Sequence, residues 1–264
     1  MKELDETTPN YLNNLEDKIV ELSLKLKAKE NELNTHKMGE LLLLKNFTHN
    51  LKNPIGNIMS FSDMILMSGE KISSEKQHKY LDIIQNASNF SMSLINTFSE
   101  YFILKNSNEI LEKSTINVHQ IILDEVDILK SWASERDITV EIKKTKEIIY
   151  LNTNEKGIRK IVTNLIHNAI RFSKDNSRIF IELTQDEDTI EIKIIDQGIG
   201  ISEVNLSKIF NEFFVCNTYD LYKIKCIGLG LSTSKTLTES LNGKLKVKSE
   251  LNKGTLVLLN FENK

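Results

Sequence analysis

Residues 164–172 read Asn-Leu-Ile-His-Asn-Ala-Ile-Arg-Phe, and they begin the most informative pattern in the chain. Asn164 and Asn168 are four residues apart, so a helix places their side chains on one face, one turn apart. Two neutral carboxamides on one face can hold a hydrated divalent cation and phosphate oxygens without adding negative charge. The stretch therefore predicts a helix with a polar, ligand-binding face.

Two glycine-rich stretches follow in a fixed order. Residues 196–201, Asp-Gln-Gly-Ile-Gly-Ile, come directly after an apolar strand pattern at 190–195. The carboxylate of Asp196 can accept a hydrogen bond from an exocyclic amine, and the glycines let the backbone approach a flat base. Residues 228–232, Gly-Leu-Gly-Leu-Ser, precede a helical stretch at 231–241, whose free N–H groups favour phosphate. Each cluster alone is a weak signal, but the three in order, with strands between them, indicate a nucleotide site.

This order resembles the ATP-binding domain of sensor histidine kinases and of the wider GHKL ATPase superfamily. Residues 47–55, Phe-Thr-His-Asn-Leu-Lys-Asn-Pro-Ile, resemble the H box of that family, in which the histidine accepts the γ-phosphoryl group. Residues 209–214, Ile-Phe-Asn-Glu-Phe-Phe, resemble the F box, and residues 253–255, Lys-Gly-Thr, resemble the closing strand signature. The resemblance covers about residues 38–261, which is nearly the whole chain.

Length and composition are compatible with this resemblance. A chain of 264 residues allows two modest domains or one large one. The net charge of −3 argues against non-specific nucleic-acid binding. No apolar run approaches the roughly 18 residues needed to span a membrane, and the first residues lack the apolar core of a signal peptide. We therefore expect a cytoplasmic protein with no nucleic-acid partner and no membrane span.

The two cysteines, Cys216 and Cys226, fit no metal-binding spacing. Free thiols in a reducing compartment are the simplest interpretation. Because the two residues bracket a loop that we expect to be mobile, a redox role remains a second interpretation.

The N-terminal part carries apolar residues at alternating spacings of three and four. This period of 3.5 predicts a left-handed coiled coil over residues 1–37. Lys29 and His36 occupy seam positions and are expected to weaken it toward its C-terminal end. The segment is either a plain dimerisation rod or a helix that transmits a signal to the next one. The apolar seam positions are Leu12, Leu15, Ile19, Leu22, Leu26 and Leu33.

Residues 38–107 predict a helical hairpin, with serine and glycine at 68–69 and serines at 73–74 marking the turn. Each helix has one apolar stripe, which it cannot bury alone, so two hairpins are expected to form a dimeric four-helix bundle. A homodimer is therefore expected. The stripes are Leu44, Phe47, Leu51, Ile55, Ile58 and Ile65 on the first helix, and Tyr80, Ile84, Ala87, Phe90, Leu94, Phe98 and Tyr101 on the second.

His49 lies on the first helix of this hairpin. At about 100° per residue it is roughly 160–200° from Phe47 and Leu51, so it points away from the apolar stripe. An exposed histidine is what a phosphoacceptor needs, because ATP and a partner aspartate must both reach it. Pro54 lacks an N–H group and is expected to bend the helix five residues later.

After a polar junction at 106–108, helices alternate with strands. This pattern predicts a two-layer α/β sandwich over residues 108–264, with helices on one face of a mixed sheet. The fold class is thus α followed by α/β. The expected helices are 119–136, 155–173 and 231–241, and the expected strands are 138–142, 148–151, 178–184, 190–196, 244–249 and 256–261.

The resemblance implies a role for each residue of the nucleotide site. Asn164 and Asn168 contact the nucleotide and Mg²⁺, with Asn168 as the direct metal ligand. Arg171 faces the phosphates, as suits a guanidinium group, and Phe172 lies near the adenine. Asp196 binds the adenine amino group. The remaining expected contacts are Gly198, Gly200 and Ile201 beside the adenine, Gly228, Gly230 and Leu231 beside the phosphates, and Lys223 and Lys225 in an ATP lid at 215–227.

The implied reaction is phosphoryl transfer from ATP to His49, and from there to an aspartate on the receiver domain of a separate response regulator. The residue after the family's histidine is usually acidic, but here it is Asn50, which cannot act as a base. Asn53 fits the position that orients water for response-regulator dephosphorylation, so a phosphatase activity is also implied. Two interpretations remain: an active histidine kinase, or a weakly catalytic or non-catalytic nucleotide-binding scaffold that docks a regulator or another kinase.

Overall fold

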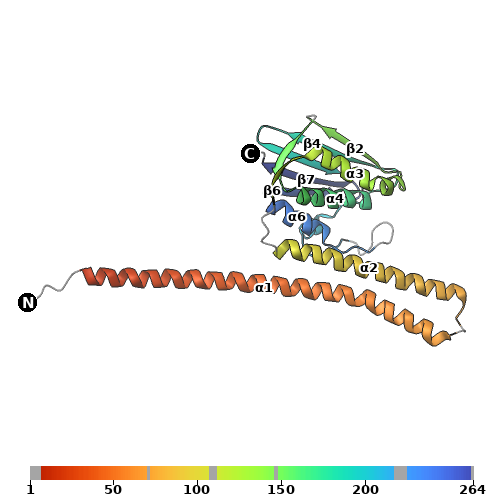
Figure 1. Cartoon of the computed structure of the whole chain (residues 1–264), viewed down its shortest axis with the longest axis horizontal. Coiled ribbons are helices and arrows are strands. Elements are labelled where there is room, and N and C mark those ends of the chain that lie inside the picture. Colours follow the sequence, from red (N-terminus) through yellow and green to blue (C-terminus); the bar gives the residue numbers. More distant parts are fainter. Residues whose placement is uncertain (1–6, 70–71, 107–111, 146–147, 217–224, 263–264) are drawn as a thin grey trace, which may run out of the picture. The chain divides into compact units, whose positions relative to one another are not determined.

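The computed structural model describes residues 7–69, 72–106, 112–145, 148–216 and 225–262. It contains two compact units, one up to Asn53 and one from Pro54 onward, and each is considered by itself. Helix α1 (Thr7–Ser68) includes the expected coiled-coil segment and the first helix of the hairpin as one continuous helix (Figure 1). The helix is not interrupted at Pro54, and no break marks the expected boundary between residues 37 and 38. That domain boundary remains a prediction.

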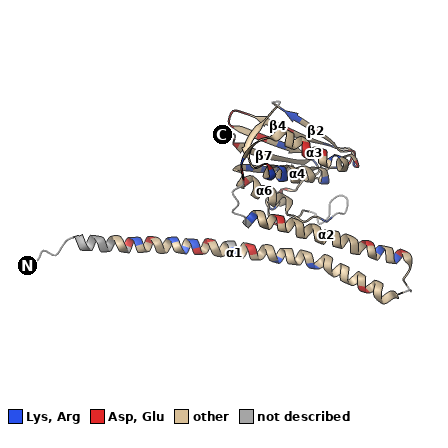
Figure 2. Cartoon of the chain, in the orientation of Figure 1, with Lys and Arg blue, Asp and Glu red and all other residues tan. Residues whose placement is uncertain are grey.

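The N-terminal unit is a helix with an uncovered apolar seam. Ile19, Leu22 and Leu26 are each more than half exposed in the single chain. Charged side chains are frequent along the first half of α1 and become sparse farther along it (Figure 2), and Lys29 pairs with Glu32 at 3.1 Å. A second helix along the seam would cover the leucines, so the exposure fits the predicted coiled coil, which remains a prediction. The side chains of Leu12 and His36 lie outside the described residues.

The hairpin turn lies where the sequence predicts it. Helix α1 ends at Ser68, and α2 (Ser74–Asn106) begins at the second serine of the expected pair. Gly69 has φ 51°, a left-handed conformation that ends helices and that glycine adopts without steric cost. Near the turn, the ring centroids of Phe61 and Tyr80 are 5.2 Å apart and join the two helices. No helix in the described part of the chain is long and apolar enough to cross a membrane.

The C-terminal part of the α2 stripe is buried within the single chain. Leu94, Phe98 and Tyr101 are all buried. The ring of Phe98 stacks on that of Phe213 at 6.3 Å, and the Tyr101 hydroxyl donates to Glu212 Oε1 at 2.7 Å. The sequence shows this apolar face but not that residues more than a hundred positions later cover its end.

The C-terminal domain has two layers, as predicted, with helices on one face of a five-stranded sheet (Figure 1). Strand order is β2-β4-β5-β7-β6; β2 runs parallel to β4 and the other neighbours are antiparallel. The prediction of a mixed sheet is confirmed. The helices are α3 (Val118–Ser134), α4 (Glu155–Phe172) and α6 (Gly230–Ser240), and the strands are β2 (Thr139–Lys144), β4 (Arg178–Gln185), β5 (Thr189–Ile195), β6 (Gly243–Glu250) and β7 (Gly254–Glu262).

Two short elements were not predicted. Strand β1 (Ser114–Asn117) pairs antiparallel with β3 (Tyr150–Thr153), and together they form a separate two-stranded sheet. The strand expected at 148–151 thus lies two residues later and outside the main sheet. The other unpredicted element is helix α5 (Glu203–Leu206). Both β1 and α5 have four residues, too few to show a period. Of the polar junction expected at 106–108, only Asn106 lies within the described residues.

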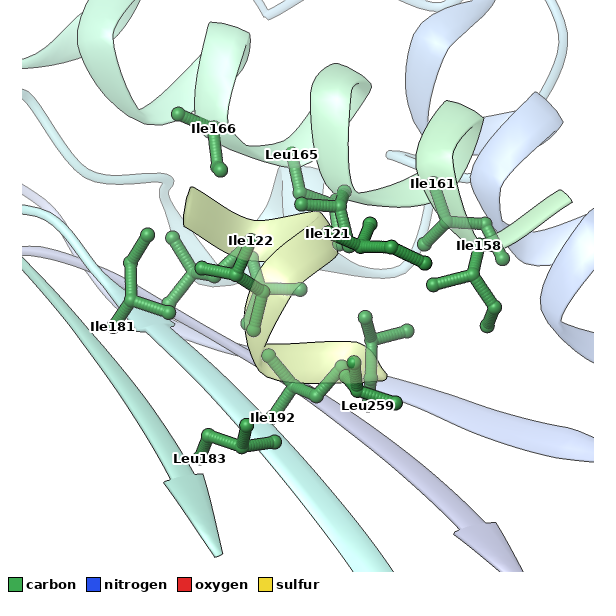
Figure 3. Packing of buried hydrophobic residues seen from close by; sticks show 14 of the residues in the cluster. Ile121, Ile122, Ile158, Ile161, Leu165, Ile166, Ile181, Leu183, Ile192 and Leu259 are labelled. Carbon is green, nitrogen blue, oxygen red and sulfur yellow. The ribbon is translucent and has the colours of Figure 1, made fainter. Parts of the chain in front are cut away.

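The core lies between α4 and the sheet (Figure 3). Ile158, Ile161 and Leu165 follow the helical period on α4, while Ile181 and Leu183 alternate along β4. All of these side chains are almost completely buried. Asn154 caps the start of α4, since its Oδ1 accepts from the backbone N–H of Gly157 at 2.8 Å. The Asn154 cap therefore sets where α4 begins, and the buried apolar face sets its rotation about the helix axis.

We expect Ile181→Ala to lower the free energy of unfolding by about 2–5 kcal/mol, because it opens a cavity at a fully buried position of β4. The matched control is Ile128→Ala on α3, where the side chain is 66% exposed and the change should stay within about 0.5 kcal/mol. Urea denaturation of both variants measures the difference. Equal losses would contradict this account of the core.

Candidate active site

A cavity of about 310 Å³ opens in the C-terminal unit among α4, the turn after β5 and the segment that leads into α6. It gathers three sequence stretches that lie far apart in the chain. Of the nucleotide contacts predicted from the sequence, Gly198 and Lys225 do not line it, and Gly198 is buried beside Asp196. The lining residues from that prediction are Asn164, Asn168, Arg171, Phe172, Asp196, Gly200, Ile201, Gly228, Gly230 and Leu231.

The polar face of α4 forms one wall. Because the apolar face of this helix is buried in the core, Asn164 and Asn168 are turned toward the cavity, and both are partly buried. Gly230, the first residue of α6, lies so close that a Cβ atom on it would be 3.7 Å from Asn168 Nδ2. Carboxamide oxygens are suitable ligands for Mg²⁺. Among the described lining residues Asp196 is the only carboxylate, so the site fits a metal bound together with phosphate.

Arg171 and Phe172 occupy the last turn of α4. The Arg171 guanidinium lies 5.8 Å from the centre of the Phe172 ring, and its Nη2 donates to the carbonyl oxygen of Lys225 at 3.2 Å. Lys225 Nζ in turn lies 4.6 Å from the centre of the Phe90 ring on α2. The predicted phosphate-facing arginine is therefore also bonded to the end of the expected lid. Residues 217–224 of that lid, with Lys223, lie outside the described residues.

Asp196 directly follows β5 and is only 8% exposed. Two backbone N–H groups donate to its Oδ1, that of Gly198 at 2.8 Å and that of Thr255 at 3.1 Å. These bonds hold the carboxylate in place and leave Oδ2 for another donor. Burial raises the pKa of Asp196 from 3.8 to about 6, although the two backbone donors act in the opposite direction. The pKa of this carboxyl group therefore lies close to neutral pH.

Glycine is required at two contacts around Asp196. A Cβ atom on Gly198 would lie 2.2 Å from the carbonyl oxygen of Phe172, and one on Gly254 would lie 2.0 Å from that of Asp196. Gly254 also has φ 110°, which other residues rarely adopt. The turn after β5 is therefore packed between the end of α4 and the start of β7 at backbone distance. The resemblance of residues 253–255 to a family signature had indicated this position.

The opposite side of the cavity is formed by the start of α6. Gly228 has φ 79°, and its carbonyl oxygen accepts from the backbone N–H of Phe213 at 2.9 Å. Leu229 occupies the cap position and offers no side-chain hydrogen bond, so the first N–H groups of α6 are available to a ligand. Phe214 and Ile209 of the F-box-like segment also line the cavity.

Sequence reasoning missed several lining residues. His167 lines the cavity and stacks on Trp132 of α3, with ring centroids 4.6 Å apart. Its position three residues after Asn164 on a helix was a usable signal. Ser93 and Thr97 come from α2, and no pattern in the sequence connects them with the nucleotide motifs. Cys216 and Cys226, neither of which forms a disulfide, also line the cavity.

His49, Asn50 and Asn53 of the H-box-like stretch belong to α1, in the unit that ends at Asn53. The predicted exposure of His49 is confirmed, and Asn53 is exposed as well. Asn50 is partly exposed. The neighbouring Thr48 donates its hydroxyl to the carbonyl oxygen of Leu44 at 2.8 Å and does not cap any helix end. The histidine is thus accessible on one face of a long helix.

Comparison with known sequences matches residues 153–264 to the family described as histidine kinase-, DNA gyrase B-, and HSP90-like ATPase. Histidine protein kinase SaeS of Staphylococcus aureus is 26% identical over 250 residues, which are 94% of this chain and 71% of SaeS. Histidine kinase P4 of Formosa agariphila is 27% identical over 233 residues, which are 87% of this chain but only 17% of that protein.

Solved structures share the fold at lower identity. Histidine kinase ThkA, in a complex with the response regulator protein TrrA, superposes with a TM-score of 0.65 at 20% identity, covering 82% of this chain and 60% of ThkA. The histidine kinase AdeS of Acinetobacter baumannii gives a TM-score of 0.61 at 17% identity, covering 82% of this chain and 98% of AdeS. The order of long helices and α/β sheet is therefore that of histidine kinase structures.

We expect the stability of the nucleotide-free protein to depend on pH through Asp196. Because its folded pKa is raised to about 6, the folded state binds the proton more readily than the unfolded state does. This contribution to stability is complete below about pH 4 and is lost as the pH rises through about 6. Asp196→Asn does not titrate, so it should become more stable than the wild type as the pH rises, by at most about 3 kcal/mol.

Urea denaturation of both proteins between about pH 4 and pH 7.5 tests this expectation. Asp188→Asn is the control, since Asp188 is exposed in the turn between β4 and β5. Its unfolding free energy should follow that of the wild type at every pH. If the Asp196→Asn difference were also independent of pH, the raised pKa of Asp196 would be refuted.

Proposed function

We propose that this chain is an ATP-dependent histidine autokinase, which phosphorylates His49. The chain is homologous to histidine kinases, and residues 153–264 match the histidine kinase-like ATPase family. One observation carries the proposal. Three motifs separated by tens of residues in the sequence line a single cavity, and each one supplies the group that a different part of ATP requires. The exposed histidine of the H-box-like segment supplies the acceptor.

The cavity has a place for each part of the nucleotide. The carboxylate of Asp196 accepts a hydrogen bond from the adenine amino group, with Phe172 beside the base. The phosphates lie toward Arg171 and the N-terminus of α6. Asn164 and Asn168 would hold Mg²⁺, with Asn168 as the direct ligand. When bound there, Mg²⁺ neutralises charge on the phosphates.

The chemistry is phosphoryl transfer, which depends mainly on positioning and on electrostatic stabilisation. A neutral imidazole nitrogen of His49 attacks the γ-phosphorus with its lone pair. A nitrogen–phosphorus bond forms, the bond from the γ-phosphorus to the bridging oxygen breaks, and ADP leaves. The phosphorylated imidazolium then loses its N–H proton to water, because Asn50 cannot act as a base, although the Asn50 carboxamide oxygen can orient the ring. Asn53, one turn later on the helix, would orient the water molecule that dephosphorylates a response regulator.

The partners follow from the same proposal. The phosphohistidine passes its phosphoryl group to an aspartate on the receiver domain of a response regulator, and ThkA, which shares this fold, forms a complex with such a protein. A homodimer would cover the exposed seam of α1. In this arrangement residues 1–37 form a coiled coil, residues 38–107 the dimerisation and phosphoacceptor hairpin, and residues 108–264 the ATP-binding domain.

We expect His49→Ala to abolish autophosphorylation and to leave nucleotide affinity unchanged, because the nucleotide motifs all lie in the other unit of the chain. The matched control is His78→Ala, which removes an exposed histidine from α2. The purified proteins are incubated with γ-labelled ATP and Mg²⁺, and the label is tested for lability in acid. Acid-labile label on His49→Ala, or its loss from His78→Ala, would refute the assignment of His49.

The scaffold alternative is favoured by one residue, Asn50, which stands where an acidic residue is usual. If a carboxylate beside His49 assists proton removal, Asn50→Asp should raise the initial rate of phosphohistidine formation. General-base assistance is typically worth about 10²–10⁴-fold, and we expect the lower part of that range or less, because a large fraction of imidazole is already neutral at pH 7. ATP affinity should stay the same.

Initial rates at saturating Mg·ATP, measured side by side for the wild type and Asn50→Asp, distinguish the two functions. A wild type that binds ATP but forms no phosphohistidine supports the scaffold. An active wild type with an unchanged or slower Asn50→Asp variant shows that Asn50 suffices as it is, and removes the main argument for the scaffold.

A further inference from the structure

A buried arginine outside the cavity holds the end of α4, the helix that carries Asn164 and Asn168. Arg136 follows α3 and is only 6% exposed. Its Nη1 donates to the carbonyl oxygen of Ile170, and its Nη2 donates to that of Ser173 at 2.6 Å. Its Nε pairs with Asp175 Oδ1 at 3.1 Å. The backbone joins the same contact, because the N–H of Asn176 donates to the Arg136 carbonyl oxygen at 3.1 Å.

These contacts satisfy the C-terminus of α4. The last four carbonyl groups of a helix have no partner within it, and a cation at that end is favoured by the helix dipole. Arg136 occupies two of these carbonyls, those of Ile170 and Ser173. The carbonyl of Phe172, between them, accepts from the N–H of Ile199 at 3.1 Å. The helix end is thus bonded on one side to Arg136 and on the other to the turn after β5.

The same turn carries the adenine-binding carboxylate. Ser173 pairs with Gly198 in an isolated β-bridge, and Gly198 approaches the Phe172 carbonyl too closely for any side chain. The N–H of Gly198 then donates to Asp196 Oδ1 at 2.8 Å. A continuous series of hydrogen bonds therefore runs from Arg136 through the end of α4 to Asp196.

We propose that Arg136 is a positioning residue of the nucleotide site, which sets the adenine-binding carboxylate of Asp196 relative to Phe172 through the carbonyl groups at the end of α4. This inference rests on the proposed function. Arg136 does not line the cavity, so we assign its effect on the site to these backbone bonds.

The charge distribution around Arg136 supports this role. Its carboxylate partner Asp175 has a side chain that is 57% exposed, so this ion pair contributes little. Arg159, by contrast, joins α4 to α3 through Asp124 and Glu125 and also pairs with Glu155 on its own helix, and none of these residues lines the cavity. A buried guanidinium needs acceptors to offset its lost hydration, and for Arg136 these include the two carbonyls at the end of α4.

The test compares Arg136→Met, Arg136→Lys and Asp175→Asn in the full chain. Dissociation constants for ADP and inosine diphosphate are measured by calorimetry with Mg²⁺, and circular dichroism checks folding. Inosine lacks the exocyclic amine that Asp196 would bind. We expect Arg136→Met to weaken ADP by about tenfold and inosine diphosphate by less than about twofold, so that selectivity for adenine falls. Arg136→Lys should lie in between, and Asp175→Asn should match the wild type.

Each outcome decides between the alternatives. Equal weakening of both nucleotides in Arg136→Met would mean a general loss of structure and would overturn the proposal, as would a folded variant with the wild-type selectivity. If Arg136→Met does not fold, Arg136→Lys decides, and selectivity equal to that of the wild type overturns the proposal. A wild type that binds neither nucleotide would instead refute the proposed function itself.

Discussion

The packing of one face of α4 on the sheet is the constraint on which the site depends. Ile158, Ile161 and Leu165 are fully buried against the strands, which leaves the helix only one rotation about its axis. That rotation turns Asn164 and Asn168 toward the cavity, because at about 100° per residue they lie at the edge of the buried face. A loss of core packing would therefore displace the polar wall of the site as well as lower stability.

The side of the cavity next to β5 shows how a carboxylate is kept in a costly environment. Burial disfavours the ionised form of Asp196, and the backbone donors from Gly198 and Thr255 offset only part of that effect. The surrounding turn remains in place because its glycines allow contacts at backbone distance. Stability without ligand and affinity for a ligand thus make opposite demands on the same carboxylate, a common property of binding sites.

Helix α2 contacts the C-terminal domain at the same side as the cavity. Tyr101 and Lys105 both donate to Glu212, and the neighbouring Phe213, in a left-handed backbone conformation at φ 60°, stacks on Phe98. Burial and the neighbouring Glu212 carboxylate raise the pKa of the Tyr101 hydroxyl, which therefore stays protonated and able to donate. The F-box-like segment is consequently held between α2 and the residues that directly precede α6.

The sequence by itself determined the periodic features of this protein. The amphipathic patterns predict the two hairpin helices, the layered α/β domain and the exposure of His49, because burial of an apolar face follows directly from residue spacing. Most of the residues that the motif order identified also line the cavity. Only the tertiary structure decided which distant surfaces meet: the cover over Tyr101, the contribution of Ser93 and Thr97, and the contact of Arg136 with the end of α4. These contacts join residues far apart in the chain, and local spacing carries no information about such encounters.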